Sequence, residues 1–203
     1  MITIVDYGLG NIRAFQNIYN QLNIDCAVAR DTETLRNASK LILPGVGSFD
    51  FAMTSLQRSG MRHMLDELVL VENIPLLGIC VGMQMLANSS EEGSLDGLGY
   101  IDGTVKKFSK KRTAVEPLPH MGWNQVNHSR QEQLFENIKN SERFYFLHSY
   151  YFQCDKESES ISKSLYGDEF TSSVRNKNIY GVQFHPEKSH AAGIRLLKNF
   201  GSI

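Results

Sequence analysis

Short apolar runs alternate with helix-like stretches over the first 90 residues, and this alternation limits the possible folds more than any other feature of the chain. The apolar runs are ITIV (2–5), DCAVA (25–29), KLILP (40–44) and IPLLGI (74–79). The stretches interpreted as the following helices are 12–22, 31–38, 50–72 and 83–90. Four strand–helix units in series predict a mostly parallel sheet covered by helices on both faces.

The second half of the chain has a different pattern of residues. Aromatic and β-branched residues with turn residues between them occupy 99–108, 120–128 and 143–153, which predicts antiparallel strands appended to the sheet. The polar segment 106–119 reads as an exposed connection. IYGVQFHPE (179–187) then resumes a buried strand, and residues 189–200 predict a closing amphipathic helix with Ser189 as its N-cap. A chain of 203 residues with this order of elements is expected to form one domain, 1–203.

Charge and cysteine usage exclude several classes of function. The 21 basic and 22 acidic residues nearly cancel, so neither nucleic acid nor an anionic membrane surface is an expected partner. The three cysteines, Cys26, Cys80 and Cys154, form no CxxC pair, and we expect no metal site and no cofactor. The N-terminus lacks a basic leader and no apolar run approaches about 18 residues, so we expect a soluble cytoplasmic protein.

The stretch GICVG (78–82) places Cys80 between two glycines where a strand is expected to end and a helix to begin. This is the spacing of a nucleophile elbow, in which glycines permit a strained turn and a close approach of helix to strand. A sulfur held there would face the helix N-terminus, and the Val81 amide could donate to an oxyanion. The alternative is an inert cysteine that serves as a small buried hydrophobe.

His185 and Glu187 are the candidates for the base and its orienting acceptor. They follow the strand-like run YGVQF, and residues i and i+2 of an extended chain point to the same side. A thiolate nucleophile needs such a pair to move the proton. His120 and His148 lie among aromatic residues, where a hydrogen-bonded structural role is expected.

PGVG (44–47) follows the third predicted strand. Glycines on either side of Val46 would let the backbone of Val46 and Gly47 turn an N–H towards a substrate oxygen, as the second donor of an oxyanion hole. A plain type II turn is the alternative interpretation.

Taken together, these residues make the chain resemble the class I (triad) glutamine amidotransferases over essentially its whole length, and most of all the glutaminase subunits of imidazole glycerol phosphate synthase. The motifs that carry the resemblance are DYGLGNI (6–12), LPGVGSFD (43–50), GICVGMQML (78–86), SSEEG (89–93), PHMGWN (119–124), FLHSYY (146–151) and GVQFHPEKSH (181–190). The resemblance implies a flavodoxin-like α/β fold of the glutamine amidotransferase type.

The resemblance also implies roles for individual residues. Cys80 would attack the side-chain amide of glutamine, His185 would carry the proton and Glu187 would orient the histidine. Val81, Val46 and Gly47 would form the oxyanion hole. Gln84, Glu92, Ser149 and Tyr150 would contact the substrate.

The resemblance further implies a heterodimer in which ammonia passes to a (β/α)8 cyclase subunit that serves histidine biosynthesis. Asn11 and Trp123 are the candidate contacts with that partner, although Trp123 could equally belong to the core. Three alternatives stay open: a paralogue that supplies a sugar-amidinating synthase in surface polysaccharide pathways, a catalytically silent regulatory subunit, and a free-standing cysteine hydrolase such as a γ-glutamyl peptidase.

Overall fold

The computed structural model describes residues 1–108, 117–128 and 131–203. The exposed connection predicted at 106–119 lies largely outside these ranges, and its first two residues, Lys106 and Lys107, belong to a strand. Within the described ranges, no helix combines the length and the apolar character that crossing a membrane would need.

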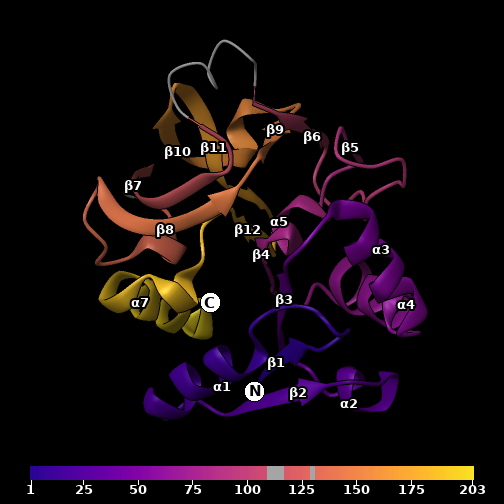
Figure 1. The fold of residues 1–203 in the computed structure, drawn as a ribbon. Helices are drawn as coiled ribbons and strands as arrows, with labels where there is room; N and C mark the ends of the chain where they lie inside the picture. The colour runs from indigo at the N-terminus through magenta and orange to yellow at the C-terminus, as the bar shows by residue number, and fades with distance from the viewer. Residues whose placement is uncertain (109–116, 129–130) are drawn as a thin grey trace.

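Five parallel strands form the centre of the sheet, in the order β2-β1-β3-β4-β12 (Figure 1). Their bounds are Ile2–Val5 (β1), Cys26–Ala29 (β2), Lys40–Gly45 (β3), Leu76–Cys80 (β4) and Ile179–Val182 (β12). If β12 is counted as the fifth strand, this is the 2-1-3-4-5 order of flavodoxin-like folds. The predicted parallel sheet and the flavodoxin-like class are confirmed.

Helices cover both faces of this sheet, as the alternating pattern predicts. In Figure 1, α1 and α7 lie on one side of the central strands, and α3 and α4 lie on the other. The helices are α1 (Ile12–Gln21), α2 (Thr32–Arg36), α3 (Phe49–Arg58), α4 (Arg62–Asp66), a π-helical turn η1 (Glu67–Val71), α5 (Val81–Gln84) and α7 (His190–Ser202). The 3-10 turns in the described part of the chain are η2 (Gln133–Phe135), η3 (Glu157–Glu159) and η4 (Pro186–Lys188).

The helix expected at 83–90 is wrong in length. Helix α5 ends at Gln84, and Ser89–Ser90 form a short strand, β5, that pairs with β6. The chain folds back after α5, so that the amide of Leu98 donates to the Met85 carbonyl at 2.7 Å. The carbonyls that a longer helix would use internally are therefore taken by the returning loop.

An antiparallel extension continues the sheet beyond β12, in the order β11-β10-β7-β8, with β9 pairing with β11 and β6. The strands are β6 (Gly103–Lys107), β7 (His120–His128), β8 (Glu142–His148), β9 (Tyr150–Cys154), β10 (Ser160–Tyr166) and β11 (Asp168–Asn176). The appended antiparallel strands predicted from 99–153 are confirmed.

The hairpin of β10 and β11 has only a weak apolar signature in the sequence, because serines occupy several of its buried positions beside Ile161, Phe170 and Val174. Ser162, Ser172 and Ser173 are buried, and the Ser162 hydroxyl lies 2.9 Å and 2.7 Å from the other two hydroxyl oxygens. Hydroxyls that bond to one another remove most of the cost of burying them. The hairpin is therefore stable without the alternation of apolar and polar residues that would identify its strands in the sequence.

Two glycines let α5 pack directly against the sheet. A Cβ atom on Gly82 would lie 1.9 Å from the Leu43 carbonyl oxygen on β3. A Cβ atom on Gly78 would lie 2.7 Å from the Gly82 carbonyl oxygen. The close approach that the GICVG spacing predicts is confirmed.

Substitution of Gly82 tests this packing. Gly82→Ala should lower the free energy of unfolding by roughly 2 kcal/mol or more, because a backbone atom rather than a flexible side chain must move. Gly201→Ala on α7 is the matched control, since its Cβ would meet only the side-chain ends of Ile24 and Ile2, at 3.2 and 3.4 Å. Urea unfolding of both variants measures the difference. Equal stability of the two would contradict the packing argument.

Candidate active site

Cys80 occupies a strained bend at the edge of the sheet. It is the last residue of β4 and directly precedes α5, with φ 56° and ψ −112°. A residue with a side chain rarely takes this conformation, which costs about 1–3 kcal/mol and is found mainly at functional sites. The predicted elbow is therefore present, and it follows the carboxyl end of a parallel strand, where ligands bind in open α/β sheets.

His185 and Glu187 are in contact and buried. The His185 Nδ1 atom lies 3.0 Å from Glu187 Oε1, and the two side chains are 4% and 3% exposed. The sequence predicts this contact, but it predicts an extended chain from His185 to Glu187, and that conformation is wrong. Strand β12 ends at Val182, and Glu187 lies in the 3-10 turn η4 rather than in extended chain.

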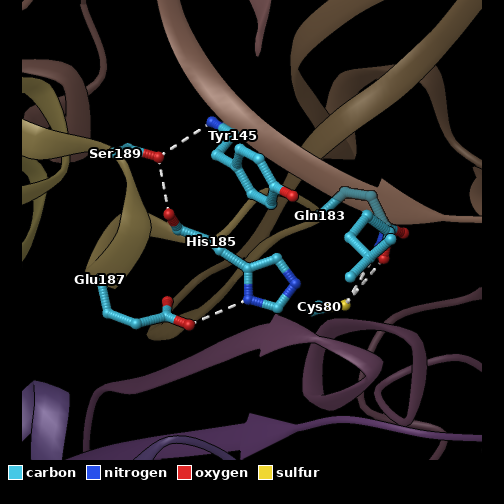
Figure 2. Close-up of polar contacts among 7 residues, drawn as sticks. Cys80, Tyr145, Gln183, His185, Glu187 and Ser189 are labelled. Atoms are coloured by element: carbon cyan, nitrogen blue, oxygen red, sulfur yellow. Dashed lines mark hydrogen bonds and ion pairs between the residues drawn. The ribbon is translucent and has the colours of Figure 1, made fainter. Parts of the chain in front are cut away.

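Backbone contacts hold His185 in place (Figure 2). The His185 amide donates to the Tyr145 carbonyl at 2.8 Å. The Ser189 hydroxyl donates to the His185 carbonyl at 2.6 Å and accepts from the Tyr145 amide at 3.0 Å. Ser189 is the N-cap residue of α7, as the sequence predicts, but its side chain makes no capping hydrogen bond. Its hydroxyl ties the histidine to β8 instead.

The pKa of His185 reflects opposing effects. Burial lowers it, whereas hydrogen bonds to Cys80 and Glu187 and the negative charges of both groups raise it. The balance raises the pKa of His185 from 6.5 to about 10. The imidazolium form is therefore favoured at neutral pH between the sulfur and the carboxylate.

A pocket of about 270 Å³ opens beside the sulfur. The predicted catalytic, oxyanion and substrate-binding residues line this pocket, with the exception of Glu187, which lies behind the His185 ring. The two predicted partner contacts, Asn11 and Trp123, lie outside it. The predicted residues on its wall are Val46, Gly47, Cys80, Val81, Gln84, Glu92, Ser149, Tyr150 and His185. Residues separated by more than a hundred positions thus meet at one cavity.

The PGVG loop forms one wall of the pocket. Val46 is 41% exposed, and Gly47 has φ 90°, a value that favours glycine. The root of the loop is fixed, because the Tyr7 hydroxyl donates to the Pro44 carbonyl at 2.7 Å. The loop is therefore anchored at its start and exposed at its tip.

Gln84 and Glu92 approach the pocket from different elements. The Gln84 Nε2 atom donates to the Tyr150 carbonyl at 3.1 Å and to Gln183 Oε1 at 3.0 Å. Glu92 Oε2 accepts from the Phe49 amide at 2.8 Å, at the start of α3. Both side chains are positioned by the protein before any ligand binds.

Sequence reasoning missed other residues at this site. Pro119, Leu147, His148 and Lys188 also line the pocket, and the Gln183 Nε2 atom lies 3.8 Å from Cys80 Sγ. The alternation of YGVQFH is a signal for Gln183, because it is two residues before His185. His120 and His148 are hydrogen-bonded to each other at 2.9 Å, as their expected structural role requires.

The two predicted partner contacts lie at the surface. Asn11 is exposed and directly precedes α1. Trp123 on β7 is 39% exposed and packs edge-on against His190, with ring centroids 5.0 Å apart. Trp123 is thus not part of the buried core, and its contact with a partner stays a prediction.

Comparison with solved structures identifies the fold. A glutamine amidotransferase crystal structure aligns over 100% of this chain and 99% of its own with a TM-score of 0.75 at 20% identity. The structure of PurLQS from Thermotoga maritima aligns over 98% of this chain and 96% of its own, with a TM-score of 0.71 at 15% identity.

Sequence comparison identifies the family. The family model for class I glutamine amidotransferases matches residues 3–202. The imidazole glycerol phosphate synthase subunit HisH of Bdellovibrio bacteriovorus is 54% identical, and that of Leptospira borgpetersenii is 48% identical, each over 100% of both chains. A HisH 2 subunit of Methanococcus maripaludis is 48% identical over 98% of both chains. The resemblance predicted from the motifs is confirmed: the chain belongs to the class I glutamine amidotransferase family.

Proposed function

We propose that this protein is the glutaminase subunit of an imidazole glycerol phosphate synthase and that Cys80, His185 and Glu187 are its catalytic triad. The observation that carries the proposal is that one pocket is lined both by Cys80, at its strained elbow, and by His185, which is paired with the buried Glu187 carboxylate. Membership of the amidotransferase family and the names of the curated relatives support the same assignment.

In the first half of the reaction the Cys80 thiolate attacks the side-chain amide carbon of glutamine. The carbonyl π-electrons move to oxygen, and the amides of Val81 and of the Val46–Gly47 segment donate to the resulting oxyanion. The His185 imidazolium gives its proton to the amide nitrogen, which leaves as ammonia. The product on the enzyme is a glutamyl thioester.

In the second half the neutral His185 removes a proton from water as the water attacks the thioester. The intermediate collapses and expels the Cys80 thiolate, which restores the thiolate and imidazolium together with free glutamate. Glu187 keeps the ring oriented and stabilises its positive charge in both halves.

Substrate recognition is assigned to the pocket wall. Glu92 carries a negative charge that suits the glutamine ammonium group. Gln84 uses both hydrogens of its amide nitrogen within the protein, so its Oε1 is left to accept from a substrate donor. The Ser149–Tyr150 backbone completes the pocket.

A partner subunit follows from the chemistry of ammonia, which is largely protonated at neutral pH and then no longer nucleophilic. We propose a heterodimer in which a (β/α)8 cyclase covers the pocket and receives ammonia directly. Asn11 and Trp123 are the proposed contact residues, and the exposure of both supports this assignment.

Removal of the nucleophile is the most direct mutational test. Cys80→Ala should lower glutamine hydrolysis by at least roughly 10⁴-fold, because the thioester cannot form. Ammonia-dependent synthesis by the complex with the cyclase should be unchanged when an ammonium salt replaces glutamine. Loss of both activities would contradict a role confined to the nucleophile.

Neutralisation of Glu187 tests the origin of the raised histidine pKa. In Glu187→Gln the carboxylate charge is lost while burial remains, so the pKa of His185 should fall from about 10. Turnover should fall by roughly 10²- to 10⁴-fold. Nitrogen-15 NMR of the His185 ring between pH 6 and 11 measures the titration.

The same variant tests how the protonation of His185 makes the free energy of unfolding depend on pH. Because folding raises the pKa of His185 from 6.5 to about 10, the stability it contributes is complete below pH 6.5 and is lost as pH rises through about 10. Glu187→Gln should flatten this dependence. An unchanged His185 titration would show that Glu187 does not hold the proton.

Activity should depend on the partner because the exposed tip of the PGVG loop forms part of the oxyanion hole. If roughly 1% of the free protein has a competent loop, binding of cyclase and acceptor nucleotide can raise hydrolysis by up to about 10²-fold. The assay mixes this protein with each candidate synthase and follows both glutamate and product. Equal rates with and without the cyclase, or product only with a sugar-modifying synthase, would contradict the assignment.

A further inference from the structure

Gln183 is a fully buried amide in contact with the nucleophile. It directly follows the last residue of β12, and its relative exposure is 0%. One end of its amide lies 3.8 Å from Cys80 Sγ, and the other end lies 3.0 Å from the Gln84 amide. Figure 2 shows the contact between Gln183 and the sulfur as a dashed line. The proposed roles of Cys80, His185 and Glu187 do not explain why a buried amide contacts the sulfur.

The hydrogen bonds around Gln183 determine which end of the amide faces the sulfur. The Tyr150 carbonyl can only accept, so the Gln84 atom 3.1 Å from it is the amide nitrogen. The second hydrogen of that nitrogen points to Gln183, whose facing atom must therefore be the oxygen. Gln183 consequently presents its amide nitrogen, a donor, to Cys80.

The Tyr150 carbonyl that sets this orientation is itself bonded to a neutral histidine, His148, and a second one, His120, holds the ring of the first. His148 Nδ1 donates to it at 2.7 Å, so His148 Nε2 must accept, and His120 Nδ1 donates to that atom at 2.9 Å. Burial, and then the neighbouring His120, lowers the pKa of His148 to about 3. Asn124 Nδ2 closes the series 3.2 Å from His120 Nε2. The carbonyl is thus fixed by His148 at the end of β8, with His120 of β7 behind it, as well as by Gln84.

The other groups around the sulfur show which of its protonation states the Gln183 donor favours. The Leu147 carbonyl lies 3.8 Å from Cys80 Sγ and can accept from a thiol, but it offers nothing to a thiolate. The donors that meet the anionic sulfur among the described side chains are His185 and Gln183. A hydrogen bond to a charged acceptor is roughly twice as strong as one between neutral groups.

We infer that Gln183 is a fourth catalytic residue, which donates a hydrogen bond to the Cys80 thiolate and holds the sulfur in its anionic, correctly aimed form. The inference rests on the proposed function of Cys80 as the nucleophile. The hydrogen bond from Gln183 weakens when the sulfur becomes part of the thioester and strengthens again when the thiolate is expelled. Gln183 therefore also favours departure of the thiolate in the second half of the reaction. A purely structural amide would stabilise the fold without affecting sulfur ionisation.

Alkylation of the free protein with iodoacetamide, followed by mass spectrometry of the Cys80 peptide between pH 5 and 10, tests the inference without partner or substrate. Gln183→Glu keeps the shape but places an acceptor against the sulfur. Gln183→Leu removes the donor. Gln57→Glu, on the exposed side of α3, adds the same charge elsewhere and is the matched control.

Other charged or titratable groups face this sulfur and stay unchanged in all three variants. They are Tyr7, Glu92, His148, His185 and Lys188.

We expect Gln183→Glu to lower the alkylation rate of Cys80 at pH 7 at least tenfold and to move the midpoint of the rate–pH curve upward by at least one unit. Gln183→Leu should move it less, in the same direction, and Gln57→Glu should match the unmodified protein. In the unmodified protein, the NMR signal of the Gln183 side-chain amide should move as Cys80 ionises and change again after alkylation, which tests the contact even if a variant does not fold.

Two results would overturn different claims. Curves for Gln183→Glu and Gln183→Leu that superimpose on that of the unmodified protein, or an amide signal that ignores Cys80 ionisation, would refute the role of Gln183 and leave the nucleophile intact. A Cys80 that alkylates at pH 7 no faster than Cys26 and Cys154 in the unmodified protein would refute the proposed function itself.

Discussion

The near-contact of α5 with β3 sets the geometry on which the whole site depends. Gly82 passes so close to Leu43 that any Cβ atom would lie 1.9 Å from its carbonyl oxygen. The chain must therefore turn from β4 into α5 within a single residue, and Cys80 takes φ 56° as a result. The parallel core on either side offsets this strain, which is worth about 1–3 kcal/mol. A sulfur held by backbone geometry keeps its position whether or not a ligand is bound.

The register of two parallel strands brings the other half of the site to that sulfur. Strand β4 lies between β3 and β12, with Gly45 opposite Cys80 and Val182 opposite Ile79. Gln183 and His185 then emerge together beside the sulfur, while Phe184 between them packs against Phe144, with ring centroids 4.2 Å apart. A slip of one residue would turn the phenyl ring to the sulfur and the imidazole into the core. Strand pairing therefore determines the geometry of the site as much as the proposed triad residues do.

The sequence predicts those parts of this molecule that depend on local pattern. The parallel strands and the elbow follow from short apolar runs and from glycine spacing. The contact of His185 with Glu187 was predicted for an extended chain, whereas Glu187 lies in the 3-10 turn η4. The β10–β11 hairpin was not predicted, because serines bonded to one another occupy several of its buried positions and interrupt the apolar pattern. The early end of α5 depends on a loop that returns from residue 98, and no local propensity encodes that contact. Gln183 was missed because its role arises from neighbours at positions 80, 84 and 150, which only the fold brings together.

The central claim is that this site activates one cysteine out of three. Burial raises the pKa of the Cys26 thiol to about 11, and burial with nearby carboxylates raises that of Cys154 to about 12, so neither is a ready nucleophile at neutral pH. The decisive measurement is peptide mass mapping after treatment at pH 7.5 with a diazo ketone analogue of glutamine, which alkylates an attacking thiolate. We expect one adduct per chain, on Cys80, and protection of Cys80 by glutamine. Adducts on Cys26 or Cys154 at comparable rates, or labelling that glutamine does not slow, would contradict the central claim.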